Sequence, residues 1–191
     1  SNDHLVPPAH RKLLERLPGV ESIEFIGEYP IAELTYHDPG LPLQIKMEAF
    51  SPFIPLDSKN SGLPAIIFNL TVTNPTDRVM QTCLAASLQN AVGWDGVTPI
   101  FGNRCFAYGG NANSLARLGG ITAINMATVR LPEDDDGYGS MTLAIRSSDA
   151  TYATQWNDLE SMWNDFSSDG ALSNVADSTP SPVGYTWNGA L

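Results

Sequence analysis

Four segments of this chain alternate apolar and polar side chains with a period of two. They are residues 43–49, 66–73, 80–88 and 141–145. Successive side chains of a β-strand point to opposite faces of a sheet, so this alternation is typical of strands with one buried face. Weaker runs predict three more strands, at residues 22–27, 31–37 and 121–129. The chain is therefore expected to be mostly β.

Short turn sequences separate several of these segments. Asp38-Pro39-Gly40 offers a fixed φ at proline followed by a glycine that tolerates positive φ, and residues 74–77 (NPTD) have the same turn character. Consecutive strands with short links favour antiparallel meanders over crossover helices. With 42% hydrophobic and 16% charged residues, the chain can also bury a core. We predict an all-β fold, an antiparallel two-sheet β-sandwich with short peripheral helices.

Helical patterns are confined to the two ends of the chain. Residues 9–17 favour a short helix that ends at Pro18-Gly19. An apolar stripe at helical spacing consists of Trp156, Leu159, Trp163 and Phe166. We favour a helix that packs these rings onto the sandwich over an exposed sugar-stacking platform.

Two long loops are expected, at residues 90–108 and 132–140. The second contains four adjacent carboxylates, at residues 133–136. They lack the alternating ligand spacing and the distal glutamate of a calcium-binding EF-hand loop. A solvated acidic turn is therefore the preferred interpretation.

Charge and hydropathy exclude several classes of partner. The chain has 10 Lys+Arg against 21 Asp+Glu, a net charge of −11, and its cations are scattered. No basic stripe follows a phosphate backbone, so we expect no nucleic-acid partner. No apolar run approaches the roughly 18 residues of a membrane span, so no transmembrane segment is predicted.

Cysteine and histidine give no metal pattern. Cys83 and Cys105 are too few for a disulfide scaffold, and the sequence leaves open whether they pair or lie buried as free thiols. His4, His10 and His37 stand in no HxH or HExxH arrangement. We predict no metal site.

Known catalytic motifs are not found in the sequence. It has no GxSxG elbow, and residues 109–114 (GGNANS) lack the Gly-Lys of a phosphate-binding loop and the strand-to-helix context of a dinucleotide site. No cofactor is expected. Glycoside hydrolysis needs two carboxyl groups at a defined separation, and the sequence cannot show which of its 21 acids come together.

Six short motifs follow one another in a characteristic order. They are FIGEYP at residues 25–30, LPL at 41–43, EAFSPFIP at 48–55, SKNSGLP at 58–64, VTNPTD at 72–77 and SLQN at 87–90. In this order they resemble the N-terminal β-sandwich domain of glycoside hydrolase family 116, the bile-acid β-glucosidase or non-lysosomal glucosylceramidase family. The match is most specific over residues 20–95.

The resemblance implies a supersandwich-like domain that precedes a helical (α/α)6 catalytic barrel. It divides the chain into an N-terminal segment with a short helix (1–19) and a sandwich (20–191) that would continue past Leu191. In the family the nucleophile and the acid/base residue lie in the barrel. Since no residue here matches either motif, no catalytic residue is assigned, and we expect no activity from this chain alone.

The partner implied by the resemblance is the barrel, with a glucoside or glycolipid as the substrate of the parent enzyme. We interpret residues 51–55 and 57–64 as fold or domain-interface features. The candidates for contact with a sugar or with the barrel lie in the long loop and are Asn90, Trp94, Asp95 and Arg104.

Two other functions stay open at this point. One is a stand-alone carbohydrate-binding sandwich, which needs Trp94, Trp156 or Trp163 exposed as a flat platform. The other is a small hydrolase, which needs a carboxylate pair in a cleft.

Overall fold

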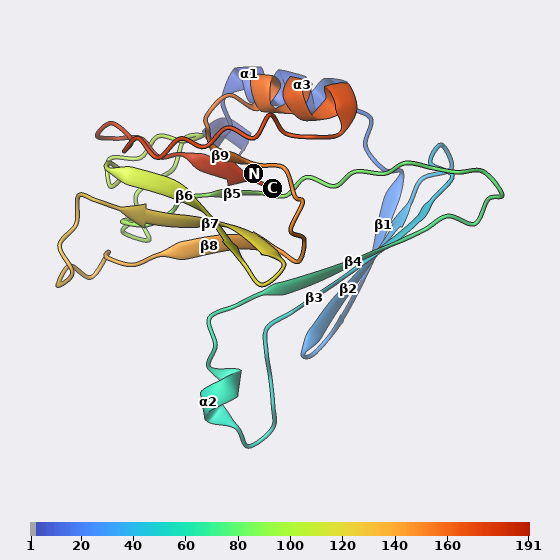
Figure 1. Cartoon of the computed structure of the whole chain (residues 1–191), viewed down its shortest axis with the longest axis horizontal. Helices are drawn as coiled ribbons and strands as arrows, with labels where there is room; N and C mark the ends of the chain where they lie inside the picture. Colours follow the sequence, from blue (N-terminus) through green and yellow to red (C-terminus); the bar gives the residue numbers. More distant parts are fainter. Residues whose placement is uncertain (1–2) are drawn as a thin grey trace. The chain divides into compact units, whose positions relative to one another are not determined.

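The computed structural model describes residues 3–191, which contain ten strands in three antiparallel sheets (Figure 1). The predicted all-β antiparallel class is confirmed. The described chain forms two compact units, one of residues 17–81 and one of the remaining described residues.

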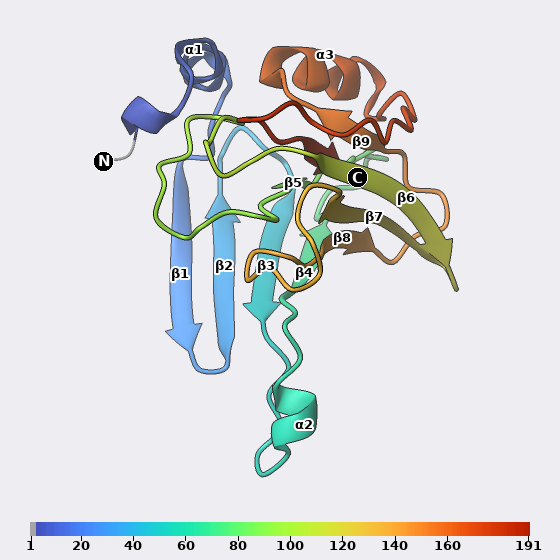
Figure 2. The same ribbon diagram turned by 90° about the vertical axis from the view of Figure 1, so that its left-hand side faces the viewer.

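Residues 17–81 form a four-stranded meander. The strands are β1 (Ser22–Glu28), β2 (Ile31–His37), β3 (Gln44–Phe50) and β4 (Ile67–Thr73), and they lie side by side in that order (Figure 2). All four predicted strands agree with these bounds to within one residue. The long connection between β3 and β4 contains the one-turn helix α2 (Ser58–Ser61).

The second unit contains two three-stranded sheets. One has the order β6 (Asn111–Leu118), β7 (Ile121–Thr128), β8 (Met141–Ile145), and the other has the order β5 (Ser87–Gln89), β10 (Asn188–Ala190), β9 (Ala153–Trp156). Ile124 and Met126 of β7 are fully buried and pack against Leu191 and Leu88. A Cβ atom at Gly189 would lie 3.0 Å from Ile124 Cγ2. These contacts make the unit a two-layer sandwich.

Two helices in this unit lie next to each other: α1 (Pro8–Arg16) and α3 (Leu159–Asp169) (Figure 1). A short 3-10 helix, η1 (Asp3–Leu5), precedes them. The Arg16 guanidinium donates to the Glu160 carboxylate at 3.2 Å. Gly170, at φ 80°, ends α3 in the left-handed region. The predicted helix at residues 9–17 is confirmed with a shift of one residue.

One predicted strand is wrong. Of residues 80–88, only Ser87 and Leu88 belong to a strand, β5. Alternation alone does not make a strand, because its N–H and C=O groups also need a hydrogen-bonding neighbour. The backbone first finds one at Ala86, which exchanges two hydrogen bonds with Leu191, of 2.9 and 3.0 Å.

The position of Trp156, one additional strand and the state of the two cysteines were not predicted from the sequence. Trp156 lies in β9, so the helical stripe consists of Leu159, Trp163 and Phe166 alone. Strand β6 was not predicted, because its sequence NANSLARL alternates weakly. Cys83 and Cys105 are both free, the first exposed and the second buried.

Acid is expected to destabilise the chain through its aspartates. Hydrogen bonds from neighbouring side chains and N–H groups hold the pKa of five carboxyls below the usual 3.8: Asp57, Asp95, Asp158, Asp165 and Asp177. A group with a lowered folded-state pKa contributes its full stability above its unfolded pKa and loses it as the pH falls through the folded value. The melting temperature should therefore fall as the pH drops below about 4.

The measurement is a series of thermal melts from neutral to acidic pH. The matched variant is Asp158→Asn, since asparagine also caps a helix but does not titrate. It should melt near the wild-type temperature at neutral pH and lose less stability in acid. An identical acid dependence in the two proteins would contradict the assignment for Asp158.

Candidate functional site

The sheet of residues 17–81 has one apolar face, on which the Tyr36 hydroxyl is the only polar side-chain group. Directly paired residues of neighbouring antiparallel strands point to the same side, so the register defines each face. Phe25 pairs with Leu34, Leu34 with Met47 and Met47 with Leu70. The apolar face consists of Ile23, Phe25, Gly27, Ala32, Leu34, Tyr36, Ile45, Met47, Ala49, Phe68, Leu70 and Val72.

The opposite face of the same sheet is mostly polar and charged. The Lys46 ammonium lies 2.7 Å from the Glu33 carboxylate and 3.8 Å from that of Glu48. The hydrogen bond to Glu33 is the main reason that the pKa of Lys46 is raised. One face therefore suits water and the other suits a packing partner.

No second layer within residues 17–81 covers the apolar face. None of its twelve residues is buried, and Phe25 and Phe68 are 64% and 62% exposed. Contiguous apolar patches of this kind mark interaction surfaces in proteins. The apolar face is thus the first candidate site.

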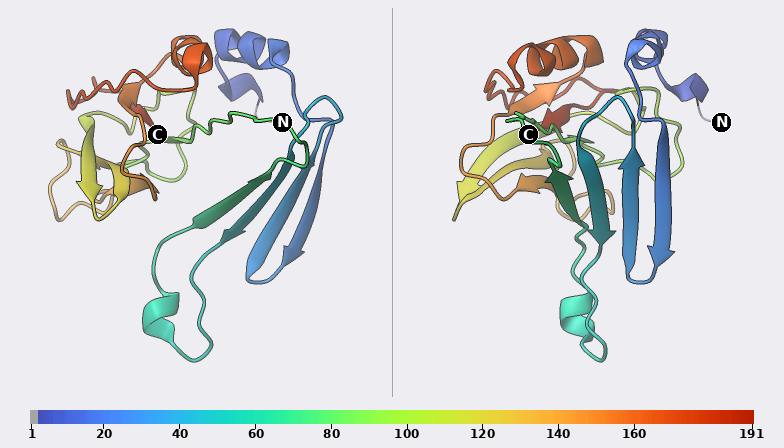
Figure 3. Two further views of the ribbon diagram at one scale, coloured as in Figure 1. Left: turned by 45° about the vertical axis from the view of Figure 1, so that its right-hand side comes forward. Right: turned by 90° about the vertical axis from the view of Figure 1, so that its right-hand side faces the viewer.

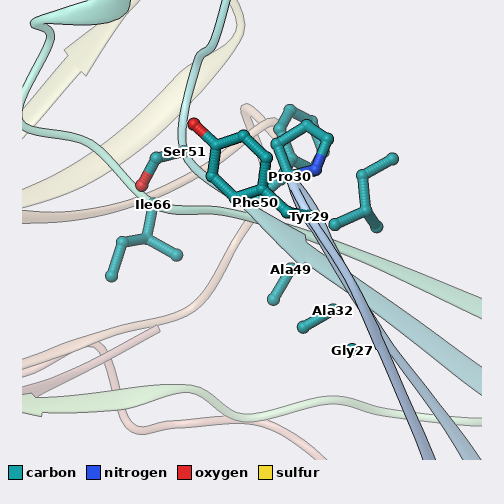
Figure 4. Close-up of a pocket in the computed structure, with 9 residues that line it drawn as sticks. Gly27, Tyr29, Pro30, Ala32, Ala49, Phe50, Ser51 and Ile66 are labelled. Carbon is teal, nitrogen blue, oxygen red and sulfur yellow. The ribbon is translucent and has the colours of Figure 1, made fainter.

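A shallow hollow of about 430 Å³ lies at one end of the apolar face (Figure 4). Gly27, Ala32 and Ala49 are neighbours in one register row, and their small size lowers the surface there. The other residues that line it are Tyr29, Pro30, Ile31, Phe50, Ser51 and Ile66.

The lining of the hollow determines what it can receive. It offers the hydroxyl groups of Tyr29 and Ser51, and its nine residues include no carboxylate, imidazole, thiol or ammonium group. The Tyr29 ring also packs edge-on against Phe53, with 5.2 Å between ring centroids. This chemistry suits an inserted apolar side chain better than acid–base catalysis.

The connection from β3 to β4 forms an arm, residues 51–66, that extends beyond the end of the sheet (Figure 3). Its own hydrogen bonds hold its shape. The Ser61 hydroxyl donates to Ile54 O at 3.0 Å and accepts from Ile54 N–H at 2.9 Å. Asp57 caps α2 by accepting from Asn60 N–H at 3.0 Å. The two ends of the arm, Ser51 and Ile66, line the hollow.

Three of the four predicted contact residues lie on the surface of the long loop. Trp94 is 41% exposed, and its Nε1–H donates to Thr98 O at 2.8 Å. Asp95 accepts from the N–H groups of Val97 and Thr98 at 3.1 and 2.8 Å. Hydrogen bonds from the Thr98 side chain and N–H lower the pKa of Asp95.

Arg104 lies in the same loop, with its guanidinium 5.2 Å from the centre of the Tyr185 ring. No hydrogen bond or ion pair recorded in the described chain joins the side chains of Trp94, Asp95 and Arg104 to one another. A shared contact role for these three residues therefore stays a prediction.

Asn90, the fourth predicted residue, is completely buried. Its Nδ2 donates to Asn113 Oδ1 and Ala127 O, both at 2.9 Å. Its Oδ1 accepts from Val92 N–H at 3.1 Å and from Asn111 Nδ2 at 3.2 Å. Because the side chain has no exposed surface, we assign Asn90 a role in holding the start of the loop.

Comparisons with known proteins agree with the ordered motifs. A family model described as β-glucosidase 2, glycosyl-hydrolase family 116 N-term, matches residues 7–191. The chain belongs to this family. No curated protein matches the sequence. The apolar face and the long loop are therefore features of a family 116 N-terminal domain.

In this family 116 N-terminal domain the remaining tryptophans give no clear platform. Trp156 and Trp163 are each only partly exposed, and Trp163 packs against Phe166 with 6.3 Å between ring centroids. The carboxylates of residues 133–136 are all exposed, as expected for a solvated turn. Among the described residues, no helix has the length and apolar character needed to cross a membrane.

Sequence reasoning did not identify the hollow. Its floor comes from three strands, and only the pairing register shows that Gly27, Ala32 and Ala49 are neighbours. The available signal was the run of small residues at matching strand ends. It becomes informative only once the order β1-β2-β3 is known.

Proposed function

We propose that this chain is a non-catalytic accessory domain of a family 116 glycoside hydrolase, and that its apolar face packs against the helical catalytic domain of that enzyme. The observation that carries the proposal is the apolar face, a complete side of a four-stranded sheet with no charged side chain. The family match supports the kind of partner, since the matched family is an N-terminal region of a glycoside hydrolase.

The energetics favour such a contact. Burying one large apolar side chain is worth about 1.5–3 kcal/mol, and the apolar face presents several large ones, including Phe25, Met47 and Phe68. Contacts between the domains of one chain commonly bury a surface area comparable with one face of a sheet of this size. The hollow adds a place where the partner can insert a side chain.

The test measures binding between this chain and a separately produced family 116 catalytic domain. We expect Phe25→Asp to weaken binding at least ten-fold, because a carboxylate would have to be desolvated in the contact. The unfolding free energy of the chain alone should change by less than about 1 kcal/mol, since Phe25 is 64% exposed.

The matched control is Ile26→Asp. Ile26 is the next residue of β1, is 45% exposed and points to the opposite face. It should bind like the wild type. If Phe25→Asp binds as tightly as the wild type, the apolar face is not the interface. Hydrolysis of an aryl β-glucoside by this chain alone would contradict the non-catalytic role.

A further inference from the structure

The tip of the arm contains a leucine in an unusual backbone conformation. The Asp57 N–H donates to Ile54 O at 3.0 Å, which closes a four-residue turn with Pro55 second and Leu56 third. Leu56 has a φ of 67°. A turn with proline second and a positive φ at the third position strongly prefers glycine or asparagine there. Leucine at this position is therefore strained.

The side chain of Leu56 gains nothing from this position within the chain. It is fully exposed, so no packing contact offsets the strain or the hydration of its apolar surface. Backbone strain of this kind persists where the surrounding structure holds it, and it often accompanies a binding role. The combination of strain and full exposure at one apolar residue points to an external contact.

The arm holds the backbone on both sides of Leu56 in one conformation. Pro55 fixes the backbone before Leu56, and Asp57 caps α2 immediately after it. The two hydrogen bonds between Ser61 and Ile54 join the two sides of the tip. A pre-organised backbone lowers the conformational entropy that is lost on binding.

We infer that Leu56 is an anchor that inserts into an apolar pocket on the catalytic domain of the glycoside hydrolase. The inference rests on the proposed function, because the two ends of the arm line the hollow of the apolar face and thus continue the same surface. The pocket must be apolar and of the size of one branched aliphatic side chain. Three further residues are exposed on the arm and would contact the rim of that pocket: Phe53, Ile54 and Leu63.

The experiment uses the full chain and the separately produced family 116 catalytic domain, with Leu56→Asn and Leu56→Gly as variants. Both replacements accept a positive φ, so both should keep the turn and melt at the wild-type temperature or up to about 4 °C above it. Both should bind the catalytic domain at least ten-fold more weakly. If Leu56 had a purely structural role, its replacement would instead lower the stability of the chain and its binding affinity together.

The matched control is Leu118→Asn, which makes the same chemical change at a leucine that is 82% exposed in β6, outside the arm. It should bind like the wild type. If the Leu56 variants bind within two-fold of the wild type, the anchor is overturned while the proposed function stands. If the wild-type chain does not bind the catalytic domain, both are overturned.

Discussion

Replacing Asn90 by leucine is expected to lower the free energy of unfolding by about 3 kcal/mol or more, because two buried polar groups lose their partners at about 1–3 kcal/mol each. The variant leaves Asn113 Oδ1 and the Val92 N–H without the hydrogen bonds that they make to Asn90. Leucine has the branched skeleton of asparagine but a larger volume, so crowding in the fully buried site adds to the loss of hydrogen bonds. Urea unfolding of both proteins measures the difference.

The control for this prediction is Asn125→Leu. Asn125 lies on β7, is exposed and accepts a hydrogen bond from the Thr142 hydroxyl at 3.1 Å. Water can replace that bond, so its loss should change stability by no more than about 0.5 kcal/mol. A loss at Asn90 as small as that at Asn125 would show that the buried amides do not hold the loop.

Replacing Ile124 by alanine should cost about 3 kcal/mol, within the 2–5 kcal/mol typical of such core truncations. Ile124 is fully buried between the two sheets of its unit. Gly189→Ala alone should also destabilise, by about 1–3 kcal/mol, because the new methyl group would lie 3.0 Å from Ile124 Cγ2 and from Met126 Cε.

The double variant distinguishes sheet-on-sheet packing from two independent effects. With Ile124 shortened, the methyl group at residue 189 enters the space that is left, so the combined loss should be smaller than the sum by about 1 kcal/mol or more. The control pairs Ile124→Ala with Gly139→Ala, where an added Cβ would meet no atom within 4 Å. That pair should be additive. Additive losses in the test pair would contradict the packing of β10 over β7.

The alternation of side chains determined most of the strands directly. It predicted β1 to β4, β7 and β8 because each of these strands has one apolar side. Such a strand shows a period of two in its own sequence. It failed at residues 80–88, where the pattern is present but most of the backbone has no neighbouring strand. It also missed β6, β9 and β10, whose small and polar side chains give little periodic contrast.

The ordered motifs determined the family, and the family match over residues 7–191 confirms it. They did not determine which residues form the site. Asn90, Trp94, Asp95 and Arg104 lie in one loop of the sequence, yet Asn90 is buried in an amide network and the others are on the surface. Burial depends on contacts with distant strands, such as that between Asn90 and Asn113, which no local pattern encodes.

By itself the sequence determined an acidic, mostly β chain of the family 116 N-terminal type, because composition, alternation and ordered motifs are local properties. The tertiary structure decided that twelve residues of four strands share one apolar face, and that a row of small residues makes a hollow in it. It also decided that Leu56 stands exposed at a positive φ. Register and backbone dihedrals arise from pairing between segments, and a single segment of sequence does not contain them.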